Sequence, residues 1–340
     1  MTQMADDLLF SVRGLTKHFV LQQKTWHKPE RVLRAVEDVS FDIRKGETFG
    51  LVGESGSGKS TVARLLLRAY SLTSGQLLFR QADNSVIDLS ELDNRHMRPL
   101  RREMQMIFQD PYSSLNPRMT LQELIGEPMQ LHGYSEEEIR TRVASLLSEV
   151  GLRPEYAARY PHAFSGGQRQ RICIARALAL NPSFIAADEA VSALDVSVAA
   201  QNINLLQDMQ EKFDLTYLFI THDLGMVEHI SDRLAVMYLG RIVEMGTTDE
   251  LFAQPKHPYT EALLRAVPQP DPRQRNQEKR GALKGEIPDA TNPPSGCAFH
   301  PRCPYATDLC KIERPAQRAI DGRQVSCHHA ETLALEGVGT

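Results

Sequence analysis

Residues 53–60 constrain the fold more than any other stretch, because they match the phosphate-loop pattern Gly-x-x-x-x-Gly-Lys-Ser/Thr. They read Gly-Glu-Ser-Gly-Ser-Gly-Lys-Ser, and the apolar run 47–52 before them has strand character. Between a strand and a helix that begins near Lys59, such a loop points successive backbone N–H groups at a β-phosphate. The lysine reaches the β and γ oxygens, and the hydroxyl ligates Mg²⁺. The predicted nucleotide site therefore consists of Gly53, Glu54, Ser55, Gly56, Ser57, Gly58, Lys59, Ser60 and Thr61.

A second part of the nucleotide chemistry lies downstream, in residues 183–189, which read Ser-Phe-Ile-Ala-Ala-Asp-Glu. An apolar run of this length predicts a central parallel strand. Ligands of open α/β sheets bind beyond the carboxyl ends of the strands, so we expect Asp188 beside the phosphate loop, holding Mg²⁺ directly or through water. Glu189 is then placed to polarise the attacking water. The alternative for both acids is capping of the next helix.

Residues 164–171, Phe-Ser-Gly-Gly-Gln-Arg-Gln-Arg, resemble the signature motif of ABC ATPases. Ser165 and the two glycine amides can form a second anion cradle at a helix N-terminus. Three further motifs follow the family order: Gln109 resembles the Q-loop glutamine, Asp195 ends a sequence similar to the D-loop, and His222 resembles the switch histidine. Taken singly these residues say little, but their order and spacing identify the chain as a member of this family.

The resemblance implies an α/β fold, namely a P-loop ABC ATPase core with an antiparallel β subdomain and a helical signature subdomain, over residues 8–255. It implies ATP and Mg²⁺ as ligands, with Phe19 stacking on adenine, although a phenylalanine that ends a strand is commonly a core residue. The family usually has proline after the catalytic glutamate, and here Ala190 makes that turn less rigid. The implied roles are catalysis by Glu189, His222 and Gln109, Mg²⁺ binding by Ser60, Gln109 and Asp188, and nucleotide contact by Ser165, Gly166, Gly167, Gln168 and Asp195.

Helical periodicity predicts a helical subdomain over about residues 120–180, which includes the signature. Apolar side chains recur at helical spacing in residues 123–125 and 143–150, and Gly151 supplies a stop. The acidic run 136–140 is expected to be a solvated helix face. We expect this subdomain to carry the groove for a membrane partner.

The C-terminal part of the sequence indicates one subfamily of these ATPases. His-Pro-Tyr within residues 256–260 resembles the element that begins the C-terminal extension of oligopeptide and dipeptide importer ATPases, which sets an extension at 256–340. Residues 268–294 shift to Pro, Asn, Gln, Arg and Asp, which predicts an extended linker. Phe164 and residues 110–117 look more like the second ATPase of these importers than the first. A paralogous ATPase partner is therefore expected, with a homodimer as the alternative.

Four of the five cysteines gather in the extension, and Cys173 is most simply a small core residue. The chain has no signal peptide and no apolar stretch of about 18 residues, so it is expected to be soluble and cytoplasmic, where stable disulfides are uncommon. Four thiolates suit zinc and an iron–sulfur cluster equally, while the absence of CxxC pairs argues against common zinc-finger spacing. The irregular spacing, Pro301, Pro304 and the resemblance favour a four-iron, four-sulfur cluster, with zinc or reduced thiols as alternatives. The expected ligands are Cys297, Cys303, Cys310 and Cys327.

A net charge of −4 gives no basic field, which argues against a nucleic-acid partner. The resemblance implies the ATP-hydrolysing subunit of an importer at the cytoplasmic face of the inner membrane. Its partners would be two transmembrane permease subunits and a periplasmic or extracytoplasmic solute-binding protein. The solute stays open among dipeptides, oligopeptides, nickel, glutathione and opines.

One alternative function is a soluble ABC ATPase of translation or DNA repair. Those proteins usually carry two heads or a long coiled coil, and this chain has neither. A second alternative function is a catalytically silent binding subunit. The presence of Glu189 and His222 argues against it.

Overall fold

The computed structural model describes residues 4–23, 31–266 and 285–338. Its centre is an eight-stranded sheet in the order β11-β12-β10-β9-β3-β8-β7-β6. The five strands from β9 to β6 in this order run parallel, and β10 pairs antiparallel with β9. These six strands are β3 (Thr48–Val52), β6 (Met104–Ile107), β7 (Phe184–Asp188), β8 (Thr216–Thr221), β9 (Arg233–Tyr238) and β10 (Arg241–Thr247).

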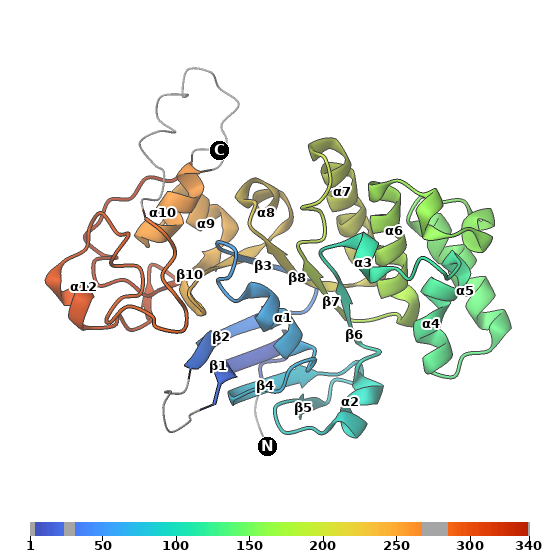
Figure 1. Cartoon of the computed structure of the whole chain (residues 1–340), viewed down its shortest axis with the longest axis horizontal. Helices are drawn as coiled ribbons and strands as arrows, with labels where there is room; N and C mark the ends of the chain where they lie inside the picture. Colours follow the sequence, from blue (N-terminus) through green and yellow to red (C-terminus); the bar gives the residue numbers. More distant parts are fainter. Residues whose placement is uncertain (1–3, 24–30, 267–284, 339–340) are drawn as a thin grey trace.

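Every residue of β3, β7 and β8 is buried, as expected for parallel strands covered on both faces. The predicted α/β class and the central position of the strand before Asp188 are thus confirmed. The helices of the core are α1 (Lys59–Leu66), α7 (Val196–Phe213), α8 (Leu224–Ile230) and α9 (Thr248–Ala253) (Figure 1).

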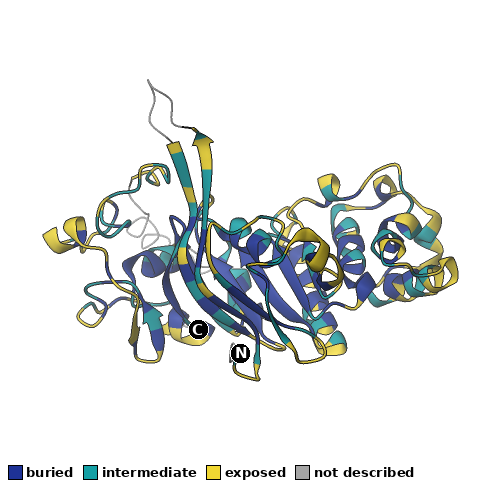
Figure 2. Ribbon diagram, turned by 90° about the horizontal axis from the view of Figure 1, so that it is seen from below, coloured by how far each residue is buried: buried dark blue, intermediate teal, exposed yellow. Residues whose placement is uncertain are grey.

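A second, four-stranded antiparallel sheet lies below the central one in Figure 1, in the order β2-β1-β4-β5. One hydrophobic cluster joins the two sheets: Phe10 of the antiparallel sheet packs against Phe184 of β7, with ring centroids 4.7 Å apart. Figure 2 shows the inner strands buried, while the far ends of β1 and β2 project from the body. The elements are β1 (Leu8–Gln22), β2 (Arg31–Arg44), β4 (Ser74–Arg80), β5 (Val86–Asp88) and α2 (Asn94–Leu100).

The predicted helical subdomain is present and occupies one end of the molecule (Figure 1). Its three main helices each begin with a capping box, in which a serine or threonine and the residue three positions later satisfy each other's backbone N–H. The acidic run 136–140 forms the solvent-facing first turn of α5, as expected. The elements are α3 (Pro111–Ser114), α4 (Leu121–Leu131), α5 (Glu136–Glu149), η1 (Pro154–Ala158), η2 (Pro161–Ala163), α6 (Gly166–Ala177) and η3 (Leu178–Leu180).

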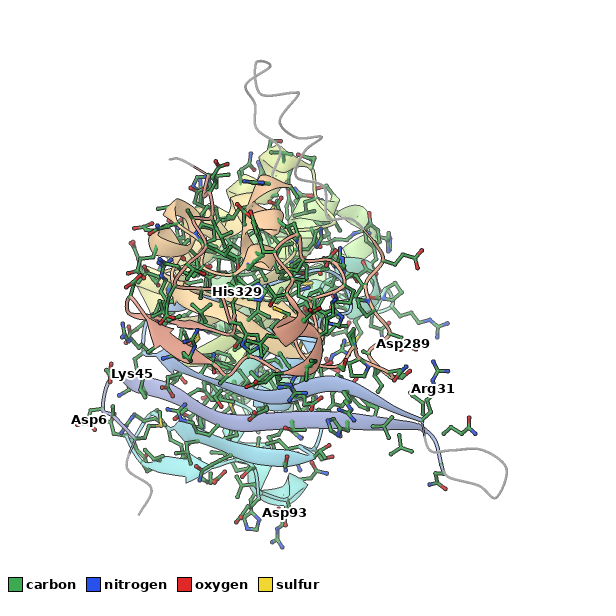
Figure 3. The ribbon with its side chains drawn as sticks, turned by 90° about the vertical axis from the view of Figure 1, so that its left-hand side faces the viewer. Asp6, Arg31, Lys45, Asp93, Asp289 and His329 are labelled. Atoms are coloured by element: carbon green, nitrogen blue, oxygen red, sulfur yellow. The ribbon has the colours of Figure 1, made fainter. Side chains whose placement is uncertain are left out.

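The C-terminal part lies at the opposite end (Figure 1) and adds two strands to the central sheet. Strand β12 pairs antiparallel with β10, placing Val325 opposite Glu244. Of the predicted linker 268–294, residues 268–284 lie outside the described residues. Asp289, just after them, accepts a hydrogen bond from Arg31 of β2 at 3.2 Å (Figure 3). The elements here are α10 (Pro258–Arg265), α12 (Asp308–Ile312), β11 (Arg318–Ile320) and β12 (Arg323–Val325).

Within the described ranges, no helix combines the length and the apolar composition that crossing a lipid bilayer requires.

Candidate nucleotide site

The phosphate loop joins the end of β3 to the start of α1, as the motif predicts. Two of its glycines are required by close packing. Gly53 has φ 149°, and a Cβ there would lie 2.2 Å from the carbonyl oxygen of Met237. Gly58 caps α1 with φ 107°, and its Cβ would lie 2.2 Å from the carbonyl oxygen of Ala35. The loop packs tightly between β2 and β9 at these two positions, so only glycine fits there.

Lys59 occupies the centre of this loop and is only 4% exposed. Its Nζ donates to the carbonyl oxygens of Gly53 (2.7 Å) and Glu54 (3.0 Å). Burial lowers the pKa of Lys59, while the nearby carboxylates of Glu189, Asp188 and Glu54 oppose this shift. The ammonium group is thus held inside the loop by carbonyl groups, where a phosphate would be a stronger partner.

Ser60 and Asp188 meet as predicted, although they are far apart in sequence. Ser60 Oγ donates to Asp188 Oδ1 at 2.8 Å, at the carboxyl end of β7. Burial raises the pKa of Asp188, and the hydrogen bond from Ser60 opposes the rise. A hydroxyl and a carboxylate side by side are the oxygen ligands that Mg²⁺ takes beside nucleotide phosphates, so these residues fit the ion.

Glu189, Gln109 and His222, the three predicted catalytic residues, also come together. Gln109 Nε2 donates to Glu189 Oε2 at 2.7 Å, and His222 Nδ1 lies 3.4 Å from Glu189 Oε1. Glu189 has φ 48°, a left-handed conformation that is uncommon for a side-chain-bearing residue. The N–H of Glu189 donates to the carbonyl of Ile220 (2.9 Å), and the carbonyl of Glu189 accepts from Ser192 Oγ (2.9 Å). These hydrogen bonds hold the turn that the family usually stiffens with proline.

The signature residues occupy the start of α6, where Ser165 and Gln168 form the capping box. A Cβ on Gly167 would lie 2.3 Å from Val198 Cγ1, so this glycine lets α6 pack closely on α7. Asp195 caps α7, accepting from the N–H of Val198 at 3.0 Å. Among the described residues, no hydrogen bond or ion pair joins residues 165–168 to the phosphate loop. Within one chain, the two predicted anion cradles therefore share no polar contact among the described residues.

Phe19 lies near the end of β1, half-buried and outside the apolar core. Its ring contacts Tyr70 edge-on, with centroids 5.4 Å apart, and Lys17 Nζ lies 5.0 Å from its centroid. Stacking on adenine stays a prediction.

Of the predicted phosphate-loop residues not yet described, Ser55 is exposed and Thr61 is half-buried.

Two residues at the site escaped sequence reasoning, and both belong to the C-terminal part. The hydroxyl of Tyr259 accepts a hydrogen bond from the N–H of Glu54 at 2.9 Å. Arg302 forms a bidentate ion pair with the carboxylate of Glu54, at 2.7 and 3.0 Å. The His-Pro-Tyr element marked Tyr259 only as a family feature. Nothing in the sequence pattern pointed to Arg302.

The four predicted cysteine ligands line one small cavity, together with His300 and His329. Burial raises the pKa of the Cys303 thiol to about 12 and that of Cys327 to about 11, which favours the neutral form. Four sulfur donors are suitable chemistry for zinc or iron–sulfur binding. The cavity between the thiols is less suitable for a metal, because its volume of about 10 Å³ has room for a single water molecule. Among the described residues, no three His, Cys, Asp or Glu side chains could hold a metal ion together. The predicted metal centre is not confirmed.

Cys173, predicted to be a core residue, is buried in α6, as expected.

Comparison with known proteins shows the family to which the chain belongs. A family described as ABC transporter matches residues 36–192, and the C-terminal region of oligopeptide/dipeptide transporters matches residues 243–310. The oligopeptide transport ATP-binding protein AppF of Bacillus subtilis is 50% identical over 330 residues, covering 96% of this chain and 99% of the relative. The chain belongs to the ABC transporter ATPase family. A probable peptide ABC transporter ATP-binding protein of Sinorhizobium fredii is 54% identical over 324 residues, covering 95% of this chain and 90% of the relative.

Solved structures of ABC ATPases share the fold of the cassette. One is a dimeric ATP-binding cassette in a post-hydrolysis state with ADP and Pi, with a TM-score of 0.60 and 29% identity, covering 71% of this chain and 99% of that one. Another is cbiO1 of Clostridium perfringens, part of an ABC transporter complex, with a TM-score of 0.61 and 27% identity, covering 72% and 91%. This ABC ATPase accordingly binds and hydrolyses ATP and couples hydrolysis to transport.

Proposed function

We propose that this ABC ATPase powers the import of peptides across the cytoplasmic membrane, from the cytoplasmic face, as a peripheral subunit. One observation carries the proposal: the cassette at 36–192 and the oligopeptide/dipeptide transporter region at 243–310 occur together in one chain. The relatives named as oligopeptide or peptide transport proteins align over both parts. We place the boundary between the ATPase domain and the extension at residues 255 and 256.

The hydrolytic step follows from the residues around Glu189. Lys59 and the loop amides would bind the β- and γ-phosphates of ATP, and Glu189 would orient and polarise the water that attacks the γ-phosphorus. His222 and Gln109 position its carboxylate from both sides. Mg²⁺, held by Ser60 and Asp188 with Gln109 nearby, would neutralise charge that builds up on the phosphates.

Two ATPase subunits are needed for a complete site. The partner subunit's residues equivalent to Ser165, Gly166 and Gly167 would close over the ATP of this one, because the two cradles share no polar contact within the described part of a single chain. ATP would then hold the dimer together, and hydrolysis would release it. The dimeric cassette with ADP and Pi supports a dimer. We favour a paralogous partner over a homodimer, because Phe164 and residues 110–117 resemble the second ATPase of such importers.

Two permease subunits would receive the motion at the helical subdomain. A hollow of about 610 Å³ lies between the core and this subdomain, lined by Phe108, Met106, Pro128 and Arg176 among others. Residues 108–115 contact both the core and the helical subdomain. Gln109 binds Glu189, while the ring of Tyr112 lies 4.1 Å from the guanidinium of Arg169 on α6. A solute-binding protein outside the membrane would deliver the peptide.

The metal centre is a separate proposal. Cys297, Cys303, Cys310 and Cys327 would hold a four-iron, four-sulfur cluster, with zinc as the alternative, as a structural staple for the extension. The cavity that all four cysteines line supports this proposal, and the thiols would have to move apart around it to take up the metal.

Uptake in cells tests the transport function. A strain that lacks the gene for this chain and is auxotrophic for one amino acid is supplied with that amino acid only as a tripeptide. We expect growth to be restored by the wild-type gene and not by Glu189→Gln. Unimpaired tripeptide uptake in the deletion strain would exclude peptide import as the function, whereas loss of nickel or glutathione uptake instead would reassign the solute.

A further inference from the structure

The C-terminal extension reaches into the phosphate loop through one residue, Glu54. All three polar groups of Glu54 are engaged. Its carbonyl accepts from Lys59 Nζ (3.0 Å), its N–H donates to the hydroxyl of Tyr259 (2.9 Å), and its carboxylate pairs with both Nη atoms of Arg302 (2.7 and 3.0 Å). Two of these three partners belong to the extension. The loop therefore depends on residues about 200 to 250 positions further along the chain.

We infer that Arg302 and Tyr259 are positioning residues of the ATP site: they fix the first half of the phosphate loop, and Arg302 neutralises the carboxylate of Glu54 beside the bound triphosphate. This role concerns ATP binding and is independent of which solute is transported.

Tyr259 is fixed by the chain around it. Its ring is fully buried and packs on Tyr238 and Phe299, with centroids 4.7 and 5.3 Å away. His257 Nδ1 accepts from the N–H of Tyr259 (3.0 Å), and the buried carboxylate of Glu244 accepts from the N–H of His257 (2.9 Å). The His-Pro-Tyr element thus begins α10 and fixes the hydroxyl that meets the loop.

Arg302 is equally restrained. Its side chain is 4% exposed, whereas that of Glu54 is 25% exposed. The hydrogen bonds to Glu54 raise the pKa of Arg302, so it stays charged. A bidentate guanidinium–carboxylate pair fixes orientation as well as charge, which a lysine cannot reproduce.

The charge matters because Glu54 belongs to a loop that must receive an anion. Without Arg302, its carboxylate would face the triphosphate as an unpaired negative charge. Near the surface of a protein, a like charge beside the triphosphate opposes binding, and we expect it to weaken affinity roughly tenfold or more. Tyr259 acts differently, because its hydroxyl removes conformational freedom from the Glu54 backbone. Freeing one residue that binding must order again weakens affinity about fivefold or more.

Nucleotide titration of the purified full chain tests the inference. With a fluorescent ATP analogue and Mg²⁺, we expect Arg302→Gln to raise Kd about tenfold and Tyr259→Phe about fivefold. In the assembled complex the loss should appear in KM rather than in kcat, since Glu189 and His222 are untouched. Arg318→Gln, which removes an ion pair with Glu331 in the same extension, and Tyr217→Phe, which removes a buried tyrosine hydroxyl elsewhere, are matched controls expected to bind normally.

A double variant tests whether the unpaired charge of Glu54 causes the loss of affinity. Glu54→Gln combined with Arg302→Gln leaves no unpaired carboxylate, so its Kd should return to within about threefold of the wild-type value. The defect of Arg302→Gln alone should also shrink at high salt. A double variant as weak as Arg302→Gln, or single variants that bind within twofold of wild type, would overturn the inference. Should Arg302→Gln fail to fold, Tyr259→Phe and Arg302→Lys decide by the same titration, and normal binding by both overturns it.

Discussion

Replacing Glu189 with glutamine removes one charge and leaves nearly everything else in place. The side chains have the same shape, and a glutamine oxygen can still accept the hydrogen bond that Gln109 donates at 2.7 Å. The left-handed turn at this residue depends on its backbone N–H and carbonyl, which the substitution retains. Lys59, Ser60 and Asp188 contact other atoms, so ATP affinity should be unchanged.

The size of the expected defect follows from the role of the carboxylate. A positioned general base contributes about 10²–10⁴-fold to a rate, so Glu189→Gln should slow hydrolysis at least ~100-fold. This corresponds to about 2.7 kcal/mol of lost transition-state stabilisation. Because binding persists while hydrolysis stops, dimers with trapped ATP should accumulate.

The assay is phosphate release by the assembled complex, together with gel filtration in the presence of ATP. Glu149→Gln is the matched control. Glu149 lies on α5 of the helical subdomain, forms an ion pair with Lys212 of α7 and is outside the site. The change must be made in both ATPase subunits, because the partner's site could otherwise still turn over. Near-normal turnover of that doubly substituted complex would refute the assignment of Glu189.

Three further predictions address other parts of the molecule. Lys59→Ala should weaken binding of a fluorescent ATP analogue by about 2–4 kcal/mol, because the triphosphate loses its main counter-charge, and unchanged affinity would disprove the phosphate-loop assignment. Substitutions at Gln109 or in residues 112–115 should reduce transport in reconstituted vesicles more than ATP turnover, whereas a strictly proportional loss would argue against coupling. Anaerobically purified protein should contain close to four iron and four sulfide per chain, lost on serine substitution of Cys297, Cys303, Cys310 or Cys327 but not of Cys173. One zinc without iron would replace the cluster by zinc, and no metal in a protease-resistant chain would exclude both.

The parts of the site that could be predicted from sequence are those encoded by contiguous residues. The phosphate loop needs glycine at two positions where a Cβ would lie 2.2 Å from a carbonyl oxygen of another strand, so the requirement is visible in the motif itself. The strand before Asp188 is an uninterrupted apolar run, and the topology of a parallel sheet then brings Asp188 to Ser60. The capping boxes of α4, α5 and α6 likewise lie within four consecutive residues.

Contacts between distant segments could not be predicted in the same way. Arg302 and Glu54 are 248 positions apart, and neither stands in a periodic pattern that names the other. Strands β11 and β12 are three residues each, too short to show alternation, yet they extend the central sheet: β12 pairs with β10, and β11 pairs with β12. For the cysteines, the sequence showed that four of them lie close together along the chain. It contains no information on whether the four thiols approach one ion closely enough to bind it.

Residues 108–115 contact both the region around Glu189 and the helical subdomain. At the start of this segment, Gln109 donates to Glu189, which also faces His222. At its end, the carbonyl of Ser114 accepts from Arg176 of α6 at 3.1 Å. Since α6 begins with the signature residues, a shift of that helix toward a partner's ATP would pull on the same short segment that orients Glu189. In the proposed dimer, closure and formation of the hydrolytic geometry would then be one event, and a permease that contacts this segment would bias both.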